Sequence, residues 1–176
     1  MEIVRQALQR MLAKHEPYPA LVINTVYSIL MTNVGFDQTI SLLLGDGALQ
    51  KFDNVYRMTF AADDLRQYID NWPVVEHFMM ARLWEEMVST QNKELLALYH
   101  EISGLRIRTD VPAYNIDHEL PMLSLTLKKD SIKASFFTTI TTLGTPLDLT
   151  TQELRIESLF PADDTTRQLF AGENIT

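Results

Sequence analysis

The sequence predicts an α+β fold in which five antiparallel strands form one sheet and helices lie across one of its faces. Two observations predict it. Apolar residues first follow the helical period, then mark two short strands, a helical middle, three further strands and a last helix. The chain also has 176 residues, of which 46% are hydrophobic, so it can form one domain with a large apolar interior.

The first segments are a helix and a pair of strands. Residues 2–15 place apolar side chains on one face at the i, i+4, i+8 spacing of a helix. Pro17 and Pro19 end that helix and favour an extended backbone after it. Residues 20–24 and 26–33 are rich in β-branched residues and Tyr, which predicts the first two strands of the sheet.

The middle of the chain is helical in character. The expected helices cover 36–44, a short segment ending at Phe60, 63–69, 72–88 and 92–102. The expected N-caps, including that of the last helix of the chain, are Asp53 or Asn54, Asn71, and Asp163 or Asp164. Pro73 falls in the first turn of its helix, where a missing N–H costs nothing. Gly45 or Gly47 is expected to end the first of these helices, and Gly104 the last.

The pattern changes to strands after an irregular connection expected over residues 106–120. The expected strands cover 122–128, 131–143 and 152–160, and a terminal helix runs to Phe170. In the first of these strands Leu123, Leu125 and Leu127 alternate with polar residues and therefore share one face. Lys129 and Asp130 form the expected hairpin turn.

The composition excludes several classes of protein. A net charge of −8 disfavours a nucleic-acid-binding surface, because such a surface needs clustered Lys and Arg. No apolar run reaches the roughly 18 residues that indicate a membrane span. The chain has no cysteine, which excludes disulfides and thiolate metal sites and fits a reducing compartment. We therefore expect a cytoplasmic protein without a membrane partner.

Catalysis finds little support in the sequence. The four histidines are scattered, and neither HExxH, nor GxSxG, nor a glycine-rich phosphate loop occurs. We therefore expect no enzyme, no catalytic residues and no metal site. A metal held by His118 with Asp110 and Asp117 in the connection before the strands stays open as an alternative.

The longest expected helix, which begins at Trp72, is apolar nearly all round. One side carries Trp72, Val75, Met79, Leu83 and Met87, and much of the rest is covered by Val74, Phe78, Ala81, Trp84 and Val88. A helix of this kind is buried on more than one side. It is therefore either a central core helix or the wall of a cavity for an apolar ligand.

Charged residues in the long helix and in the last strand each allow two interpretations, one structural and one functional. Arg82 lies between the apolar directions of its helix; facing a cavity it could hold a carboxylate in a bidentate pair, and otherwise it forms an ordinary pair with Glu86. Arg155 and Glu157 share one face of their strand, which predicts either a salt-bridged sheet face or a site. Phe136 and Phe137 point to opposite faces, so one of them is expected in the core.

Three segments carry a family resemblance. They are PYPALVINTVYSILMTN at 17–33, the Asn71–Trp72 pair, and GTPLDLTTQELRIESLFPADD at 144–164. With them, residues 10–170 resemble the C-terminal domain of MmyB-like transcription regulators, in which a helix-turn-helix module of the XRE type precedes a ligand-sensing domain with a PAS-like fold. The resemblance implies a PAS-like ligand-binding domain over residues 17–176, preceded by an N-terminal helix at 1–16.

The resemblance also implies a function, which is the sensing of an apolar, fatty-acid-like small molecule by a bacterial transcription regulator. No other cofactor is expected. The residues expected to line the pocket are Trp72, Val75, Met79, Arg82, Trp84 and Phe137. The family's acid-anchoring arginine lies nearer position 84, where this chain has Trp84, which implies a differently shaped or more apolar ligand.

Two further expectations concern partners. Fewer than 20 residues precede the first expected strand, too few for a helix-turn-helix domain, so DNA is expected to be reached only through such a domain outside this chain. The alternative function is a protein-interaction or dimerisation module without a ligand, in which the N-terminal helix or a sheet face pairs two copies. An enzyme is the third hypothesis and would need a buried carboxylate pair with raised pKa.

Overall fold

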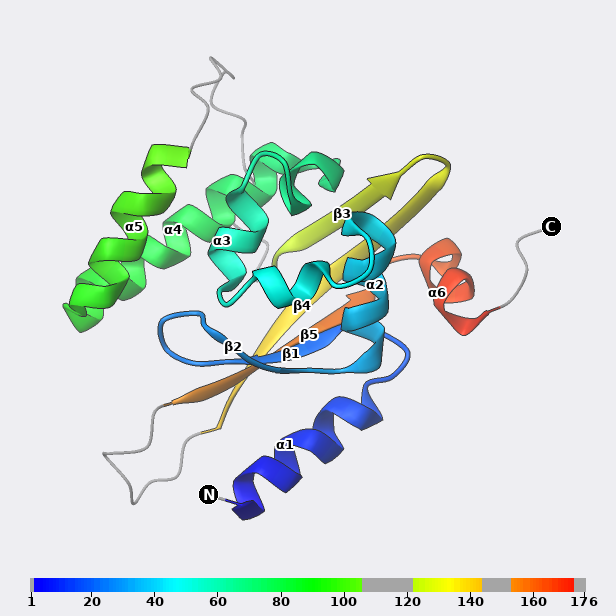
Figure 1. The fold of residues 1–176 in the computed structure, drawn as a ribbon, viewed down its shortest axis with the longest axis horizontal. Coiled ribbons are helices and arrows are strands. Elements are labelled where there is room, and N and C mark those ends of the chain that lie inside the picture. The colour runs from blue at the N-terminus through cyan, green and yellow to red at the C-terminus, as the bar shows by residue number, and fades with distance from the viewer. Residues whose placement is uncertain (1, 106–121, 144–152, 173–176) are drawn as a thin grey trace.

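The computed structural model describes residues 2–105, 122–143 and 153–172. Its centre is a five-stranded antiparallel sheet with the strand order β2-β1-β5-β4-β3, as Figure 1 shows. The strands are β1 (Ala20–Ile23), β2 (Ile29–Thr32), β3 (Ser124–Lys129), β4 (Ile132–Leu143) and β5 (Leu154–Pro161). The predicted α+β class with a five-stranded antiparallel sheet is therefore confirmed, and the architecture is consistent with a PAS-like domain.

The helices come from both ends and the middle of the chain. They are α1 (Glu2–Lys14), α2 (Val34–Leu44), α3 (Val55–Phe60), α4 (Trp72–Thr90), α5 (Lys93–Leu105) and α6 (Asp164–Ala171), with two 3-10 turns, η1 (Ala48–Lys51) and η2 (Leu65–Tyr68). The segment predicted as a helix over 63–69 is thus a short 3-10 turn. The connection predicted over 106–120 lies outside the described residues.

The two faces of the sheet carry different helices (Figure 1). Helices α2 to α5 pack on one face, and they form the main apolar core with alternate residues of the strands, such as Leu21, Phe136 and Leu159. Helix α1 packs on the other face, where Leu8 and Leu12 contact a second, smaller apolar cluster. Most of the helices therefore lie on one face as predicted, while α1 covers the opposite one.

Strand alternation decides which side chains reach the main core. Phe136 is fully buried on the face of the sheet that α2 to α5 cover. Phe137 lies on the opposite face, where its ring stacks on that of Phe160 with 5.3 Å between the ring centroids. The prediction that one of the two phenylalanines belongs to the core is confirmed. Leu123 and Leu127 are likewise buried in the main core, as their predicted alternation requires.

Asparagine and aspartate side chains fix the start of three helices. Asn33, Asn54 and Asp163 accept hydrogen bonds from backbone N–H groups in the first turns of α2, α3 and α6. Asn71 instead accepts from the backbone N–H of Thr126 at 2.9 Å and donates to the carbonyl of Ser124 at 2.8 Å, both on the β3 side. Asn71 therefore occupies the predicted N-cap position of α4, but its side chain makes no capping hydrogen bond, because its amide pairs with the edge strand β3.

Glycine positions behave differently at the two predicted helix ends. Gly45 ends α2 with a φ of 91°, a conformation that favours glycine, so one of the two predicted alternatives is confirmed. Gly104 does not end α5, which continues to Leu105. The second strand is also shorter than predicted, because Tyr27 adopts a positive φ of 64° in the turn before it.

Candidate functional site

Helix α4 presents one row of side chains to the inside of the protein. Val75 and Met79 are buried, and Arg82 lies further along the same side, half-buried. Pro73 lies in the first turn, and neither glycine nor a further proline interrupts the nineteen residues of this helix. All three side chains line a cavity between this helix and the sheet.

The cavity is small and mainly apolar. Its volume is about 80 Å³. The sheet contributes Leu21, Leu123, Leu125, Leu127, Thr138, Glu157 and Leu159, and the helices contribute Phe36, Ile40, Tyr56, Met58, Val75, Phe78, Met79 and Arg82 among others. The cavity thus lies between the two layers that the fold brings together, and only a few polar groups reach its wall.

A more polar groove adjoins this cavity. The groove has a volume of about 520 Å³ and shares Phe78, Arg82, Leu123 and Thr138 with the cavity wall. Its other walls include Glu86 and several residues of β4 and β5. Arg82 and Thr138 are therefore polar residues at the place where the apolar cavity meets the more polar groove.

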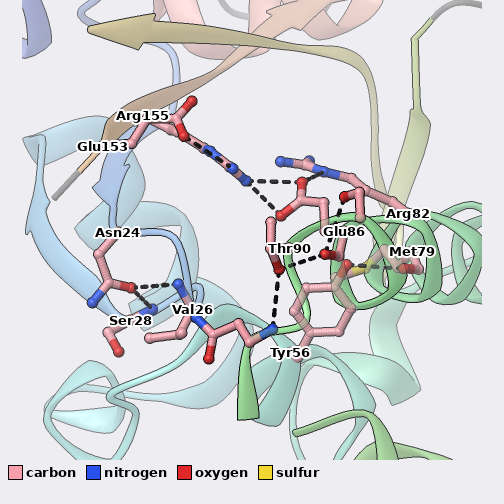
Figure 2. A network of polar contacts seen from close by, with 12 residues as sticks. Asn24, Val26, Ser28, Tyr56, Met79, Arg82, Glu86, Thr90, Glu153 and Arg155 are labelled. Carbon is pink, nitrogen blue, oxygen red and sulfur yellow. Dashed lines mark hydrogen bonds and ion pairs between the residues drawn. The ribbon is translucent and has the colours of Figure 1, made fainter. Parts of the chain in front are cut away.

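An ionic network crosses from α4 to the sheet at this place. Glu86 accepts a hydrogen bond from Arg82 Nε at 3.3 Å and two from Arg155 Nη1 at 2.8 Å each, as Figure 2 shows. Arg155 also lies 3.8 Å from Glu153, and its side chain is only 11% exposed. Burial alone would raise the pKa of Glu86, but the hydrogen bonds and charges around it, above all those of Arg155, outweigh burial and lower that pKa.

Two tyrosines lie beneath the network. The Tyr56 hydroxyl donates to the backbone carbonyl of Met79 at 2.9 Å, and its ring packs edge-on against Tyr27. The Tyr27 side chain is buried, and its hydroxyl has no hydrogen-bond partner among the described residues, although Glu86 lies near enough to affect its pKa. Burial raises the pKa of both tyrosines well above the ordinary value, so both hydroxyls are protonated at neutral pH.

Glu157 is the only carboxylate among the described residues of the cavity wall. It lies on β5, on the same strand face as Arg155, and makes no hydrogen bond or ion pair with the described part of the chain. Burial raises its pKa, and the charge of Arg82 partly opposes that shift. Across the cavity, the terminal nitrogens of Arg82 likewise donate no hydrogen bond within the described ranges.

The structure brings together three of the six residues expected to line the pocket. Val75, Met79 and Arg82 lie on the cavity wall. Trp84 is 50% exposed and packs against Tyr99 of α5, with ring centroids 5.3 Å apart, on the outer side of the helix pair.

Trp72 and Phe137 also lie away from the cavity wall. The Trp72 ring packs edge-on against Phe60, and the Arg66 guanidinium lies 4.5 Å from its centroid. Phe137 lies on the opposite face of the sheet from the cavity, because side chains alternate between the faces along β4.

The residues that a pocket prediction could have included are Arg155 and Glu157. Their shared strand face was recognisable from the sequence, and the structure turns that face toward α4. An informative signal was present in ELRIE, since its three charged residues alternate with two apolar ones and therefore share one face of the strand. Alternation alone, however, does not say which face points inward.

The described ranges contain no arrangement of side chains suited to binding a metal ion. No group of three or more His, Asp or Glu residues there could hold an ion. The alternative site of His118, Asp110 and Asp117 lies outside the described residues. No helix in the described part of the chain is long and apolar enough to cross a membrane.

Comparison with known protein families supplies the identity. Residues 4–171 match the MmyB-like transcription regulator ligand binding domain. This is a family of regulator domains and not of enzymes. No curated protein matches the chain. The match covers nearly the whole sequence. The chain belongs to the family of MmyB-like transcription regulator ligand binding domains.

Proposed function

We propose that this domain senses an apolar small molecule, with a fatty-acid-like chain, that enters between α4 and the sheet. The observation that carries the proposal is the mainly apolar cavity between the two layers, with Val75 and Met79 on one wall and Leu123 and Leu159 on the other. Small-molecule sites are typically concave, mostly apolar and equipped with a few polar groups that fix orientation. The cavity has this composition.

The size of the cavity limits how a ligand is held. At about 80 Å³ it is smaller than an engineered cavity of about 150 Å³ that binds benzene. The adjoining groove of about 520 Å³ lies within the range of roughly 300–1,000 Å³ typical of ligand pockets. A chain-like molecule therefore fits best when its tail fills the cavity and the rest extends past Arg82 and Thr138 into the groove.

The position of the ligand suggests how binding is transmitted. Arg82 lines the cavity and bonds Glu86, which in turn bonds Arg155 of β5. A ligand that reaches Arg82 competes with or reinforces this connection between helix and sheet. It shifts the protein only as far as its affinities for the two packing states differ. We propose that the change acts in the cytoplasm on DNA through a helix-turn-helix domain of the regulator.

One observation favours a second candidate function, the protein-interaction or dimerisation module. Trp84 and Val88 on α4 and Leu96 on α5 are large apolar side chains that remain about half exposed. Aromatic residues such as Trp84 are enriched where proteins associate, and an exposed apolar patch around one can mark such a surface. A homodimer formed through the α4–α5 surface is compatible with ligand binding at the other side of α4.

Native mass spectrometry of freshly purified protein tests the leading proposal. The expected result is an added mass of a few hundred daltons that leaves on denaturing organic extraction. Val75→Phe fills the cavity from α4 and should abolish this mass, while Val88→Phe, at a position 54% exposed on the same helix, should retain it. Leu123→Phe provides a second block from the sheet side if Val75→Phe does not fold.

The contradicting results are equally specific. A native protein that carries no added mass and gains none from added fatty acids, alcohols or amides would refute the sensor proposal. An added mass that survives unchanged in both cavity-filling variants would place the ligand elsewhere. If the unliganded protein is also dimeric and Trp84→Ala makes it monomeric, the interaction module becomes the better account.

A further inference from the structure

Two oppositely charged side chains line the cavity without a hydrogen bond or ion pair between them. Arg82 on α4 and Glu157 on β5 both line it. Within the described part of the chain, Arg82 donates a hydrogen bond only through Nε, to Glu86, and its guanidinium carbon lies 5.1 Å from the centroid of the Tyr27 ring. The Glu157 side chain has no hydrogen bond or ion pair among the described residues, and both side chains are partly buried. Polar groups in such places are normally satisfied by hydrogen bonds. These two groups are therefore available to a molecule that enters between them.

The charges around this end of the cavity already balance. Arg82 and Arg155 are positive, and Glu86 and Glu157 are negative when ionised. Glu153 lies further out at the edge of the groove, where its side chain is half exposed. An ionised ligand carboxylate would add an uncompensated negative charge beside Glu157, and unpaired buried charge is strongly unfavourable.

A neutral head group avoids this cost. Arg82 can only donate hydrogen bonds, so it requires an acceptor from the ligand. Ionised Glu157 can only accept, so it requires a donor from the ligand. One head that both accepts and donates satisfies the two side chains together and leaves the net charge of the site unchanged.

We propose that the ligand of this domain carries an uncharged head group, a primary amide or a hydroxyl, which accepts from Arg82 and donates to Glu157. The proposal rests on the proposed function, since it assigns the polar end of the molecule that occupies the cavity and the adjoining groove. It narrows the fatty-acid-like class to its amides and alcohols.

The surroundings of Glu157 support this choice. Burial raises the pKa of its carboxyl group, which shows that the site already resists negative charge. The remaining walls nearby are apolar, including Leu159 on the same strand face and Phe78 on α4. A second anion would therefore enter only if Glu157 took up a proton, whereas an amide or alcohol enters without any protonation change.

The test is calorimetric titration of the protein, stripped of lipid, with four compounds of the same chain length: octanamide, 1-octanol, methyl octanoate and octanoate at pH 8. The amide and the alcohol should bind most tightly. The ester accepts but cannot donate, so it should bind about three- to tenfold more weakly, the equivalent of one lost hydrogen bond. Octanoate should be weakest, by roughly tenfold or more relative to the amide.

One substitution separates charge from shape. Glu157→Gln removes the negative charge but retains a group that can accept and donate, so it should strengthen octanoate binding by roughly tenfold and leave octanamide within about threefold. The matched control is Glu101→Gln, the same chemical change at a position on α5 where the carboxylate pairs with Arg57 away from the cavity. This control should leave all four affinities unchanged.

The outcomes distinguish the two proposals. Equal binding of all four compounds would preserve the apolar sensor and overturn the assignment of a neutral head. Octanoate as the tightest of the four would also overturn it, in favour of a carboxylate held by Arg82. If none of the four binds, and the native protein carries no added mass, the sensor proposal itself fails and the head assignment fails with it.

Discussion

Both carboxylate oxygens of Glu86 accept a hydrogen bond from the same nitrogen, Nη1 of Arg155, at 2.8 Å each. Glu86 lies on α4 and Arg155 on β5, so one shared atom joins the helical layer to the middle of the sheet (Figure 2). Charge-assisted hydrogen bonds of this length are among the stronger ones in proteins. The pair therefore holds α4 at a fixed distance from β5 beside the proposed ligand site.

We expect Glu86→Gln to lower the free energy of unfolding by about 2 kcal/mol, because the largely buried Arg155 would keep only the more distant carboxylate of Glu153, 3.8 Å away, as an opposite charge. Urea unfolding measures the change. The control is Asp164→Asn, which removes an ion pair with Arg167 whose acidic partner is 79% exposed and should change stability by less than about 0.5 kcal/mol. Equal losses in the two variants would contradict the importance of the α4–β5 contact.

The two buried tyrosines should respond in opposite ways to loss of the hydroxyl. Tyr27→Phe removes a hydroxyl that has no partner in the described part of the chain, so the unliganded protein should keep or gain stability. Tyr56→Phe removes the donor to the Met79 carbonyl and should cost about 1 kcal/mol. Thermal unfolding of the two variants under one set of conditions measures the difference. A Tyr27→Phe loss as large as that of Tyr56→Phe would show that the Tyr27 hydroxyl bonds Glu86 in solution.

Glu157 should make stability fall as the pH rises. Burial raises its pKa in the folded protein above the unfolded value, and Arg82 opposes the shift only in part. From the ordinary glutamate pKa up to the raised one, the unfolded state loses its proton first, so the free energy of unfolding decreases with pH. The contribution of Glu157 to the free energy of unfolding is fully present below its pKa in the unfolded chain. It is lost as the pH rises through its pKa in the folded protein.

Glu157→Gln isolates this contribution. Glu86 titrates in the opposite sense, because its pKa is lowered and its stabilising effect is lost as the pH falls, but it is present in both proteins and cancels in the comparison. The stability of the variant relative to the wild-type protein should therefore increase from pH 4 to pH 8. Chemical unfolding at several pH values provides the curve, and a difference that does not depend on pH would show that the pKa of Glu157 is not raised.

The two glycines of α2 and α5 should differ sharply when replaced by alanine. A β-carbon on Gly35 would overlap the backbone carbonyl of Pro17, while Glu16 holds the same turn by accepting from the Gly35 N–H at 2.9 Å. Gly35→Ala should therefore cost about 1–3 kcal/mol. Gly104→Ala, in the last turn of α5 with open space around it, should instead gain about 0.5–1 kcal/mol. Circular dichroism melting of both variants measures the effect, and a harmless Gly35→Ala would contradict the packing of α2 on the Pro17 turn.

Periodicity predicted the fold well where only one face of an element is buried. Leu123, Leu125 and Leu127 alternate in the sequence and line one wall of the cavity in the structure. Local capping was predictable for Asn54 and Asp163, since a short polar side chain can reach its own helix. Asn71 has the same chemistry, but its amide pairs with β3, which lies more than fifty residues away in the sequence. A long-range partner of this kind leaves no local signal.

The candidate site was harder to predict than the fold because α4 is apolar nearly all round. Such a pattern cannot show that Val75 and Met79 face the cavity while Trp84 packs outward on α5. In the strands, alternation separates the two faces but does not say which face is inside, so it could not place Glu157 on the cavity wall and Phe137 on the opposite face. Both positions depend on the packing of one layer on another, which only the tertiary structure contains.

The two faces of strand β5 contact different parts of the protein. On one face Glu157 lines the cavity and Arg155 lines the groove, and on the other face Ile156 packs with Leu8 and Leu12 of α1. A strand is a single stiff layer, so it cannot move toward α4 without moving away from α1. A ligand in the proposed site that displaced β5 would therefore also change the packing of α1, which does not line the cavity.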